Sequence, residues 1–227
     1  RESVLAFDIS ATAEPPLQMT PQDTNVKIFY GVRAISPPPL CVRVPHRQQS
    51  AAVRRLLSDV MATAPGSSVT SEQGNSLSHS RGVAAAATSG LGRVGIDVEY
   101  ICSRRNIQAI LEAFLGPLDE TVSPAAFYRV WTFGEAYFKA FGILPEAEIL
   151  DRVFRHHSGE GLYRADHHKS PGVGVLHSKP FDDFSLTITW ELDDTPNAVI
   201  HPPAPLVHPG IGAGSDVPLA TALHHGN

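Results

Sequence analysis

The sequence predicts an α+β protein made of two similar halves. Apolar residues recur at helical spacing over 48–62 and 123–141, and shorter alternating runs typical of strands flank each helix. With 42% apolar and 18% charged residues, the chain has the composition of a folded globular protein. The doubling predicts an N-terminal subdomain at 1–100, a C-terminal subdomain at 101–195 and a loose Pro-, His-, Gly- and Ala-rich tail at 196–227.

The first half contains one clear helix, at 48–62, among short strands. Its core-facing positions follow the order i, i+3, i+4, i+7 and i+8 and are Val53, Leu56, Leu57, Val60 and Met61. Strands are predicted at Val4–Phe7, Lys27–Val32, Val83–Thr88 and Val94–Tyr100. Proline clusters at 15–16 and 37–39 mark connections, because helices and central strands avoid proline.

The second half contains the longest predicted helix. Ser123 is a suitable N-cap, Pro124 fits the first turn, and Gly142 is a natural end after Phe141. A shorter helix is predicted at 106–114. Strands are predicted at Asp151–His157, Leu162–Asp166 and Phe184–Leu192.

The bulk properties exclude some classes of partner. The 18 Lys and Arg against 23 Asp and Glu leave a formal charge of −5, which argues against a nucleic-acid surface. No window approaches 18 uninterrupted apolar residues, so we expect no membrane span. Two cysteines, Cys41 and Cys102, are too few to staple this chain and predict free thiols. Because no signal-peptide layout is present either, we expect a cytoplasmic protein.

The strand Val94–Tyr100 carries two acidic residues on one side. Alternation places Ile96 and Val98 toward the core and projects Asp97 and Glu99 from the opposite face. Adjacent carboxylates repel each other, so this arrangement favours either a cation between them or a solvent-exposed polar face. From the strand alone, both interpretations stay open.

Glu135 is a third acidic residue, on the longest helix. At about 100° per residue it falls within roughly 40° of Trp131, as do Phe127 and Phe138, and so lies inside or at the edge of the apolar face. A buried carboxylate without a partner costs several kcal/mol. Lys139, one turn on, offers an ordinary i,i+4 ion pair; a metal site beside a phosphate-binding lysine is the functional alternative.

Three carboxylates with neither cysteine nor histidine among the ligands indicate a hard cation. Mg²⁺ is bound by a few carboxylates, by waters and by phosphate oxygens of a substrate. An open site of this kind neutralises charge while a phosphoryl group moves. From the residues alone, a divalent-metal site at Asp97, Glu99 and Glu135 that serves phosphoryl-group transfer therefore stands beside the alternative of a polar strand face and an ordinary helix ion pair.

Several ordered motifs resemble those of the 4′-phosphopantetheinyl transferases. GIDVE at 95–99 is similar to the family's metal-binding strand, and WTFGEAYFKAFG at 131–142 is similar to its W-x-x-K-E-A-x-x-K-A helix. SLSHS at 76–80 resembles the S-H-S element that precedes the strand. The helix at 48–62 resembles the A-x-R-x-L-L helix, with Arg54 at the arginine. The chain length suits the two-subdomain, monomeric branch of the family, the surfactin-synthetase-activating type.

This resemblance implies a fold of two α+β subdomains related by pseudo-twofold symmetry, with coenzyme A bound between them. It implies that Asp97, Glu99 and Glu135 hold Mg²⁺ on the coenzyme A pyrophosphate, and that Lys139 helps to bind the pyrophosphate.

The resemblance also implies contacts with the other phosphates of coenzyme A. Ser78 and His79 would contact coenzyme A phosphates, and Arg47 or Arg54 would reach the 3′-phosphate. The reaction would move phosphopantetheine onto a serine of an apo acyl or peptidyl carrier protein and release 3′,5′-ADP. Glu135, or a metal-bound water, would take the serine proton, and Lys139 would assist the transfer.

Two departures from the family pattern bear on activity. Gly134 replaces the lysine that precedes the helix glutamate, and a mid-helix glycine costs about 1 kcal/mol relative to alanine. The segment 71–75 stands where many members have a G-K-P loop. We therefore expect weaker coenzyme A affinity or slower transfer than in a typical member. The alternative function is a catalytically impaired member that serves as a coenzyme A or carrier-protein binding module.

Overall fold

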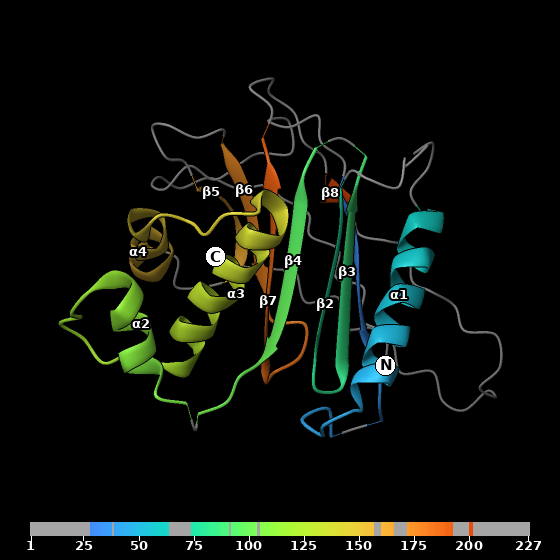
Figure 1. Ribbon diagram of the computed structural model, residues 1–227, viewed down its shortest axis with the longest axis horizontal. Helices are drawn as coiled ribbons and strands as arrows, with labels where there is room; N and C mark the ends of the chain where they lie inside the picture. The colour runs from blue at the N-terminus through green and yellow to red at the C-terminus, as the bar shows by residue number, and fades with distance from the viewer. Residues whose placement is uncertain are drawn as a thin grey trace, which may run out of the picture.

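The structure has the mixed α+β composition that the sequence predicts (Figure 1). The computed structural model describes residues 28–37, 39–63, 74–90, 92–103, 105–156, 160–165, 172–192 and 200–201. Its strands are β1 (Ile28–Ala34), β2 (Asn75–Ser80), β3 (Val83–Ser89), β4 (Val94–Tyr100), β5 (Gly161–Ala165), β6 (Val173–Ser178), β7 (Phe184–Glu191) and β8 (Ile200–His201). Its helices are α1 (His46–Thr63), α2 (Ile107–Leu115), α3 (Pro124–Phe141) and α4 (Ala147–His156).

The described strands form two four-stranded sheets. The first has the order β2-β3-β1-β8 and the second the order β4-β7-β6-β5. Neighbouring strands are antiparallel, except that the short β8 runs parallel to β1. Strand β4 therefore follows β3 in the chain but pairs with a strand from the C-terminal part. The subdomain boundary near residue 101 and the pseudo-twofold relation between the halves stay predictions.

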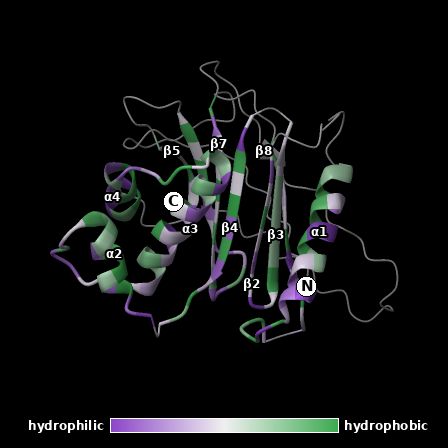
Figure 2. Cartoon of the chain, in the orientation of Figure 1, coloured by the Kyte–Doolittle hydropathy of each residue, from purple (hydrophilic) through white to green (hydrophobic). Residues whose placement is uncertain are grey.

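Helix α1 packs on one face of the first sheet. Its buried side chains Val53, Leu56 and Val60 form a cluster with Phe29 of β1 and alanines of β3. The four consecutive alanines 84–87 of β3 have no exposed surface, and the small size of Ala84 and Ala86 lets α1 lie close to the strand. The predicted helix at 48–62 is confirmed, and Figure 2 shows the hydrophobic colour along much of β3.

Helix α3 lies directly on β4 of the second sheet. Gly95 permits this approach, because a Cβ there would overlap the Ala136 carbonyl oxygen and lie 2.9 Å from the Ala140 nitrogen. The helix begins as predicted, with the Ser123 hydroxyl accepting a hydrogen bond from the first-turn backbone. It ends at Gly142, which has a left-handed φ of 73°. The packing on Gly95 brings polar side chains of α3 close to those of β4.

Strand β7 is buried on both faces. On one face, Phe184 and Trp190 belong to a core cluster that extends across both sheets. On the other face, Thr187 Oγ1 and Ser185 Oγ lie 2.8 Å and 3.2 Å from Thr132 Oγ1 of α3. Since buried hydroxyls need hydrogen-bond partners, this contact makes a polar strand face compatible with a covering helix.

The two sheets meet at their edges, β2 and β4, through serine side chains rather than a backbone ladder. Backbone N–H groups of β4 donate to three serine hydroxyls of β2: Ile96 to Ser76 (2.9 Å), Val98 to Ser78 (3.2 Å) and Tyr100 to Ser80 (3.1 Å). We call this row of hydrogen bonds the serine joint. It satisfies edge N–H groups that would otherwise lack partners between the sheets.

The prediction of a strand at Asp151–His157 is wrong, because the described residues of this segment belong to helix α4. Two ion pairs at i,i+4 spacing, Arg152–Glu148 and Arg155–Asp151, each measure 2.8 Å along this helix. Charge spacing of this kind favours a helix, and it outweighs the apolar residues that suggested a strand.

Two further features of the second half differ from expectation. Strand β6 was not predicted, because its Gly174 interrupts the strand pattern; the Trp190 ring occupies the space beside that glycine. Phe138, expected on the apolar face of the longest helix, is 46% exposed. The buried stripe of α3 runs through Phe133 and Tyr137 instead.

Some expectations concern residues at the margins of the described chain. The predicted strand Val4–Phe7 lies outside the described residues, as does the 196–227 tail apart from β8. Cys41 and Cys102 are free thiols, as predicted. None of the described helices combines the length and the apolarity that crossing a bilayer requires.

The close packing of α3 on β4 gives a first prediction. Gly95→Ala is expected to lower the free energy of unfolding by about 1–3 kcal/mol or more, because the added methyl group overlaps α3. Gly134→Ala is the matched control, since a Cβ there meets only Leu150 Cδ2, at 4.0 Å, and alanine should add up to about 1 kcal/mol. Urea denaturation measures both changes; a loss of the same size in both variants would contradict this account.

Candidate functional site

Two adjoining cavities lie along the serine joint. The larger cavity has a volume of about 730 Å³ and is lined by Arg43, Val44, Pro45, His46, Gln49, His79, Ser80, Arg81, Glu99, Tyr100, Cys102 and Arg105. The smaller cavity has a volume of about 380 Å³ and is lined by Ser50, Val53, Arg54, Leu77, Ser78, His79, Asp97, Glu99 and Lys139. Because His79 and Glu99 line both, the two cavities share a wall.

The smaller cavity contains an acidic pair and a lysine. Lys139 Nζ donates to Asp97 Oδ1 at 2.7 Å and to the Ile96 carbonyl oxygen at 3.1 Å. Asp97 is only 4% exposed, and this ammonium is an opposite charge that offsets part of the cost of burying the carboxylate. The sequence offered Glu135 as the ordinary partner of Lys139, whereas the structure pairs the lysine with an aspartate 42 residues earlier.

Serine hydroxyls hold both carboxylates of the pair. Ser78 Oγ donates to Asp97 Oδ1, and Ser80 Oγ donates to Glu99 Oε2, each at 2.8 Å. Asp97 Oδ2 is buried and has no hydrogen-bond partner among the described residues. A buried carboxylate oxygen without a partner is costly, and a cation is one way to satisfy it.

Burial shifts two titrating groups in the wall that the cavities share. Burial raises the pKa of Glu99 above its ordinary value, and the charge of Asp97 raises it further. Burial also lowers the pKa of His79, and its nearness to His46 and Lys139 lowers it further. Near neutral pH, His79 is therefore mostly an uncharged imidazole, which can donate one hydrogen bond and accept another.

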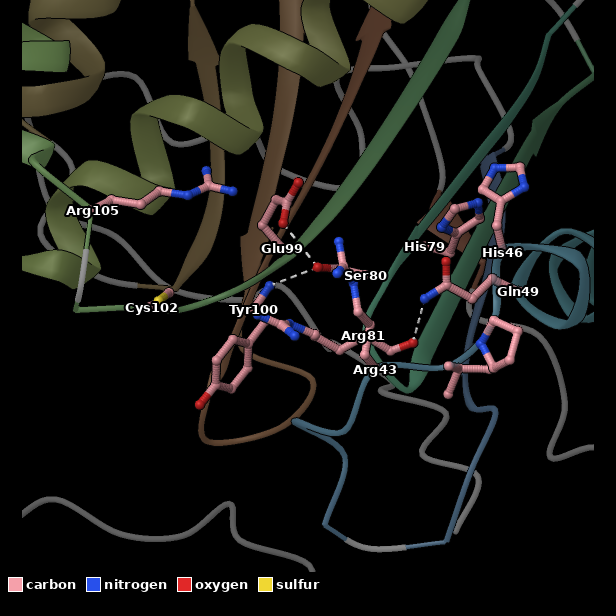
Figure 3. A pocket seen from close by; sticks show the side chains of 12 residues that line it. Arg43, His46, Gln49, His79, Ser80, Arg81, Glu99, Tyr100, Cys102 and Arg105 are labelled. Carbon is pink, nitrogen blue, oxygen red and sulfur yellow. Dashed lines mark hydrogen bonds between the residues drawn. The ribbon is translucent and has the colours of Figure 1, made fainter.

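Three arginines line the larger cavity, and the sequence motifs did not point to them. They are Arg43, Arg81 and Arg105, from the segment before α1, the β2–β3 turn and the segment before α2 (Figure 3). The guanidinium carbon of Arg81 lies 5.5 Å from the Tyr100 ring centroid, and that of Arg105 lies 5.8 Å from the Tyr128 centroid. Guanidinium groups held over aromatic rings are pre-organised to bind phosphate or carboxylate groups.

Arg81 has an unusual backbone conformation. Its φ is +54°, in the left-handed region that residues other than glycine seldom adopt. Its carbonyl oxygen accepts a hydrogen bond of 2.7 Å from Gln49 Nε2 of α1, which ties the turn to the helix (Figure 3). Such strain is often found at functional sites. Its place immediately after the SLSHS motif is the signal that could have identified Arg81 from sequence.

The structure brings together most of the residues that the sequence selected. Those that line the smaller cavity are Arg54, Ser78, His79, Asp97, Glu99 and Lys139. Arg47 is exposed and lines neither cavity, and Glu135 is half-buried and lines neither. Among the described residues, no three His, Cys, Asp or Glu side chains gather closely enough to hold one metal ion. A ligand role for Glu135 beside the acidic pair stays a prediction.

The two strand carboxylates nevertheless fit a hard cation. Asp97 offers a buried oxygen without a partner, and the raised pKa of Glu99 shows that its charge is poorly compensated. Both side chains supply oxygen atoms, the ligand type that Mg²⁺ prefers. The residues that could hold a divalent cation are therefore Asp97 and Glu99, with further oxygen ligands left to water and substrate.

The raised pKa of Glu99 gives a second prediction. Because the pKa is higher in the folded than in the unfolded state, ionised Glu99 opposes folding, and stability falls as the pH rises through the folded-state pKa. Glu99→Gln should therefore raise the free energy of unfolding at neutral pH but not below the ordinary carboxyl pKa of 4.5. Urea denaturation across this range measures the difference.

Glu120→Gln is the control for this prediction, because Glu120 is an exposed carboxylate on the loop before α3. It should change stability little at any pH in that range. An equal gain for Glu99→Gln at both ends of the range would exclude the electrostatic explanation.

A partial match to one known protein agrees with the motifs. No protein-family model matches the chain. One segment is 32% identical, over 74 residues, to the 4′-phosphopantetheinyl transferase HetI of Nostoc sp. strain PCC 7120. The match covers 29% of this chain and 31% of that relative. Together with the ordered motifs, this partial match supports membership of the 4′-phosphopantetheinyl transferase superfamily.

Proposed function

We propose that the chain transfers 4′-phosphopantetheine from coenzyme A to a serine of an apo acyl or peptidyl carrier protein, with Mg²⁺, and releases 3′,5′-ADP. One observation carries the proposal: buried Asp97 and half-buried Glu99, with Lys139 on Asp97, lie beside a cavity lined by three arginines. An acidic pair suits a divalent cation, and arginines suit the phosphates of the substrate. The partial similarity to a phosphopantetheinyl transferase supports the same reaction.

The larger cavity is proposed to bind the phosphates of coenzyme A. Its lining contains three arginines and one carboxylate, Glu99, so its charge favours a polyanion. His79, in the shared wall, can donate a hydrogen bond to a phosphate oxygen without carrying a charge of its own. Arg54 and Lys139 extend the positive charge into the smaller cavity. Arg47 is exposed and lines neither cavity, so its contact with the 3′-phosphate stays a prediction.

Asp97 and Glu99 are proposed to hold Mg²⁺, which would neutralise charge on the pyrophosphate during transfer. Glu135 is proposed as the base because it stands at the glutamate of the family's helix motif; as the structure has it, the residue lines neither cavity. In the transfer, the serine oxygen bonds to the phosphorus that carries pantetheine, and the bridging P–O bond of the pyrophosphate breaks. Glu135 takes the serine proton, and the arginines stabilise the charge on the departing 3′,5′-ADP.

A direct assay tests the proposed function. The protein is incubated with Mg²⁺, coenzyme A and a panel of apo acyl and apo peptidyl carrier proteins. Mass spectrometry should show a carrier that gains the mass of one phosphopantetheine. Asp97→Ala and the isosteric Asp97→Asn should abolish the gain, because each removes the buried negative charge in the smaller cavity.

Asp119→Ala is the matched control, since Asp119 is exposed on the loop between α2 and α3, and it should keep full transfer. Circular dichroism verifies that each variant is folded. If the protein without substitutions transfers phosphopantetheine to no carrier but binds coenzyme A in calorimetry, the proposed enzyme activity is wrong. The chain would then be a coenzyme A binding module. The observation that favours this second candidate is that Glu135 lines neither cavity, whereas Asp97 and Glu99 do.

The glycine at position 134 gives a further prediction. Gly134→Lys should tighten coenzyme A binding, because it restores a positive charge where the family pattern has lysine. The structure tolerates a side chain there, since a Cβ meets only Leu150 Cδ2 at 4.0 Å. Gly134→Gln is the control, because it gains similar helix propensity without charge. Calorimetric titration with coenzyme A compares the two; equal affinities would show that the missing charge does not matter.

A further inference from the structure

The three serines of the serine joint are chemically alike but have different neighbours on β4. Each hydroxyl accepts a hydrogen bond from a backbone N–H of β4. The residue before each of these N–H groups lies on one face of β4, the face on which α3 packs at Gly95, and at two of the three steps it is an acid. Val98 follows Asp97, and Tyr100 follows Glu99, whereas Ile96 follows Gly95. The same strand geometry therefore provides a carboxylate to two serines and none to the third.

The hydroxyl protons of Ser78 and Ser80 are used by these carboxylates. Ser78 Oγ donates to Asp97 Oδ1 and Ser80 Oγ donates to Glu99 Oε2, both at 2.8 Å. Figure 3 shows Ser80 between Glu99 and the Tyr100 backbone, with one hydrogen bond to each. A serine hydroxyl has one proton. Neither serine can donate to a substrate phosphate while it keeps this bond.

Each serine thus fixes a carboxylate relative to the backbone that carries it. Ser78 is 7% exposed and accepts from Val98 N while it donates to Asp97, so its hydroxyl is held at both ends. Lys139 donates to the same oxygen, Asp97 Oδ1. The other oxygen, Oδ2, is buried without a partner among the described residues. Ser78 and Lys139 together bind one oxygen and leave the second, buried oxygen without a partner among the described residues.

We propose that Ser78 and Ser80 are positioning residues that hold Asp97 and Glu99 in place for a divalent cation. The resemblance assigned Ser78 to a coenzyme A phosphate; the hydrogen bonds favour a role behind the carboxylates instead. This inference rests on the proposed function, because it takes Asp97 and Glu99 as the cation ligands. Hydrogen bonds that orient metal ligands affect metal affinity strongly, and their loss costs about 10–100-fold.

The serine joint supplies a matched control within the same strand. Ser76→Ala removes the hydrogen bond from Ile96 N but has no carboxylate to release. Ser78→Ala and Ser80→Ala remove an equivalent bond to β4 and also release Asp97 or Glu99. A purely structural role for the joint predicts similar effects on cation binding in all three variants. A positioning role separates Ser76 from the other two.

The test is a titration of the unmodified protein and the variants with Mn²⁺ alone, followed by electron paramagnetic resonance. Ser78→Ala and Ser80→Ala should weaken Mn²⁺ binding by about 10–100-fold, and Ser76→Ala by less than about 2-fold. Ser80→Thr keeps a hydroxyl at a half-buried position and should restore most of the affinity lost in Ser80→Ala. Thermal melting of each variant reports the separate contribution to folding.

The possible failures are distinguishable. If the unmodified protein binds Mn²⁺ and all three alanine variants bind it equally well, the positioning role is overturned while the proposed function stands. The positioning role is also overturned, and the proposed function also stands, if Ser78→Ala and Ser80→Ala keep Mn²⁺ affinity but lose affinity for coenzyme A. That result would make the two serines phosphate ligands. If the unmodified protein neither binds Mn²⁺ nor modifies a carrier protein, the proposed function fails and the inference fails with it.

Discussion

The hydrogen bonds between the serines of β2 and the backbone of β4 are the constraint on which the rest of the structure depends. These bonds join two sheets whose neighbouring edge strands, β2 and β4, are not paired through their backbones. They therefore fix how the sheet covered by α1 lies against the sheet covered by α3. Both cavities lie along this joint. If β2 and β4 were paired through their backbones, the N–H groups of β4 would need no serine hydroxyls as partners. In this structure the same hydroxyls also bond Asp97 and Glu99.

The electrostatics of the site show a balance between stability and binding. Lys139 compensates Asp97, while the pKa of Glu99 stays raised by burial and by its acidic neighbour. A folded protein that keeps a poorly compensated carboxylate gives up stability, and such sacrifices occur where a charged ligand is bound. The arginines of the larger cavity carry the opposite charge, so negative and positive groups lie on the two sides of the wall that the cavities share.

Much of the fold could be predicted because its signals are local. The N-cap Ser123, the C-terminal Gly142 and the alternation along β4 depend only on neighbouring residues. The two failures have different causes. The i,i+4 charge spacing of α4 is a local signal that already favours a helix, whereas Gly174 of β6 is explained only by the Trp190 ring that covers it. Such contacts leave no trace in a short window of sequence.

The candidate site divides in the same way. The sequence by itself determined that Asp97 and Glu99 share a strand face, that SLSHS precedes them, and that a lysine-bearing helix follows, because periodicity and motif order are properties of the chain. Only the tertiary structure decided that Lys139 pairs with Asp97 rather than Glu135. It also decided which arginines line the larger cavity. The physical reason is that α3 lies on Gly95, and a contact between residues 41 positions apart or more depends on how whole elements pack.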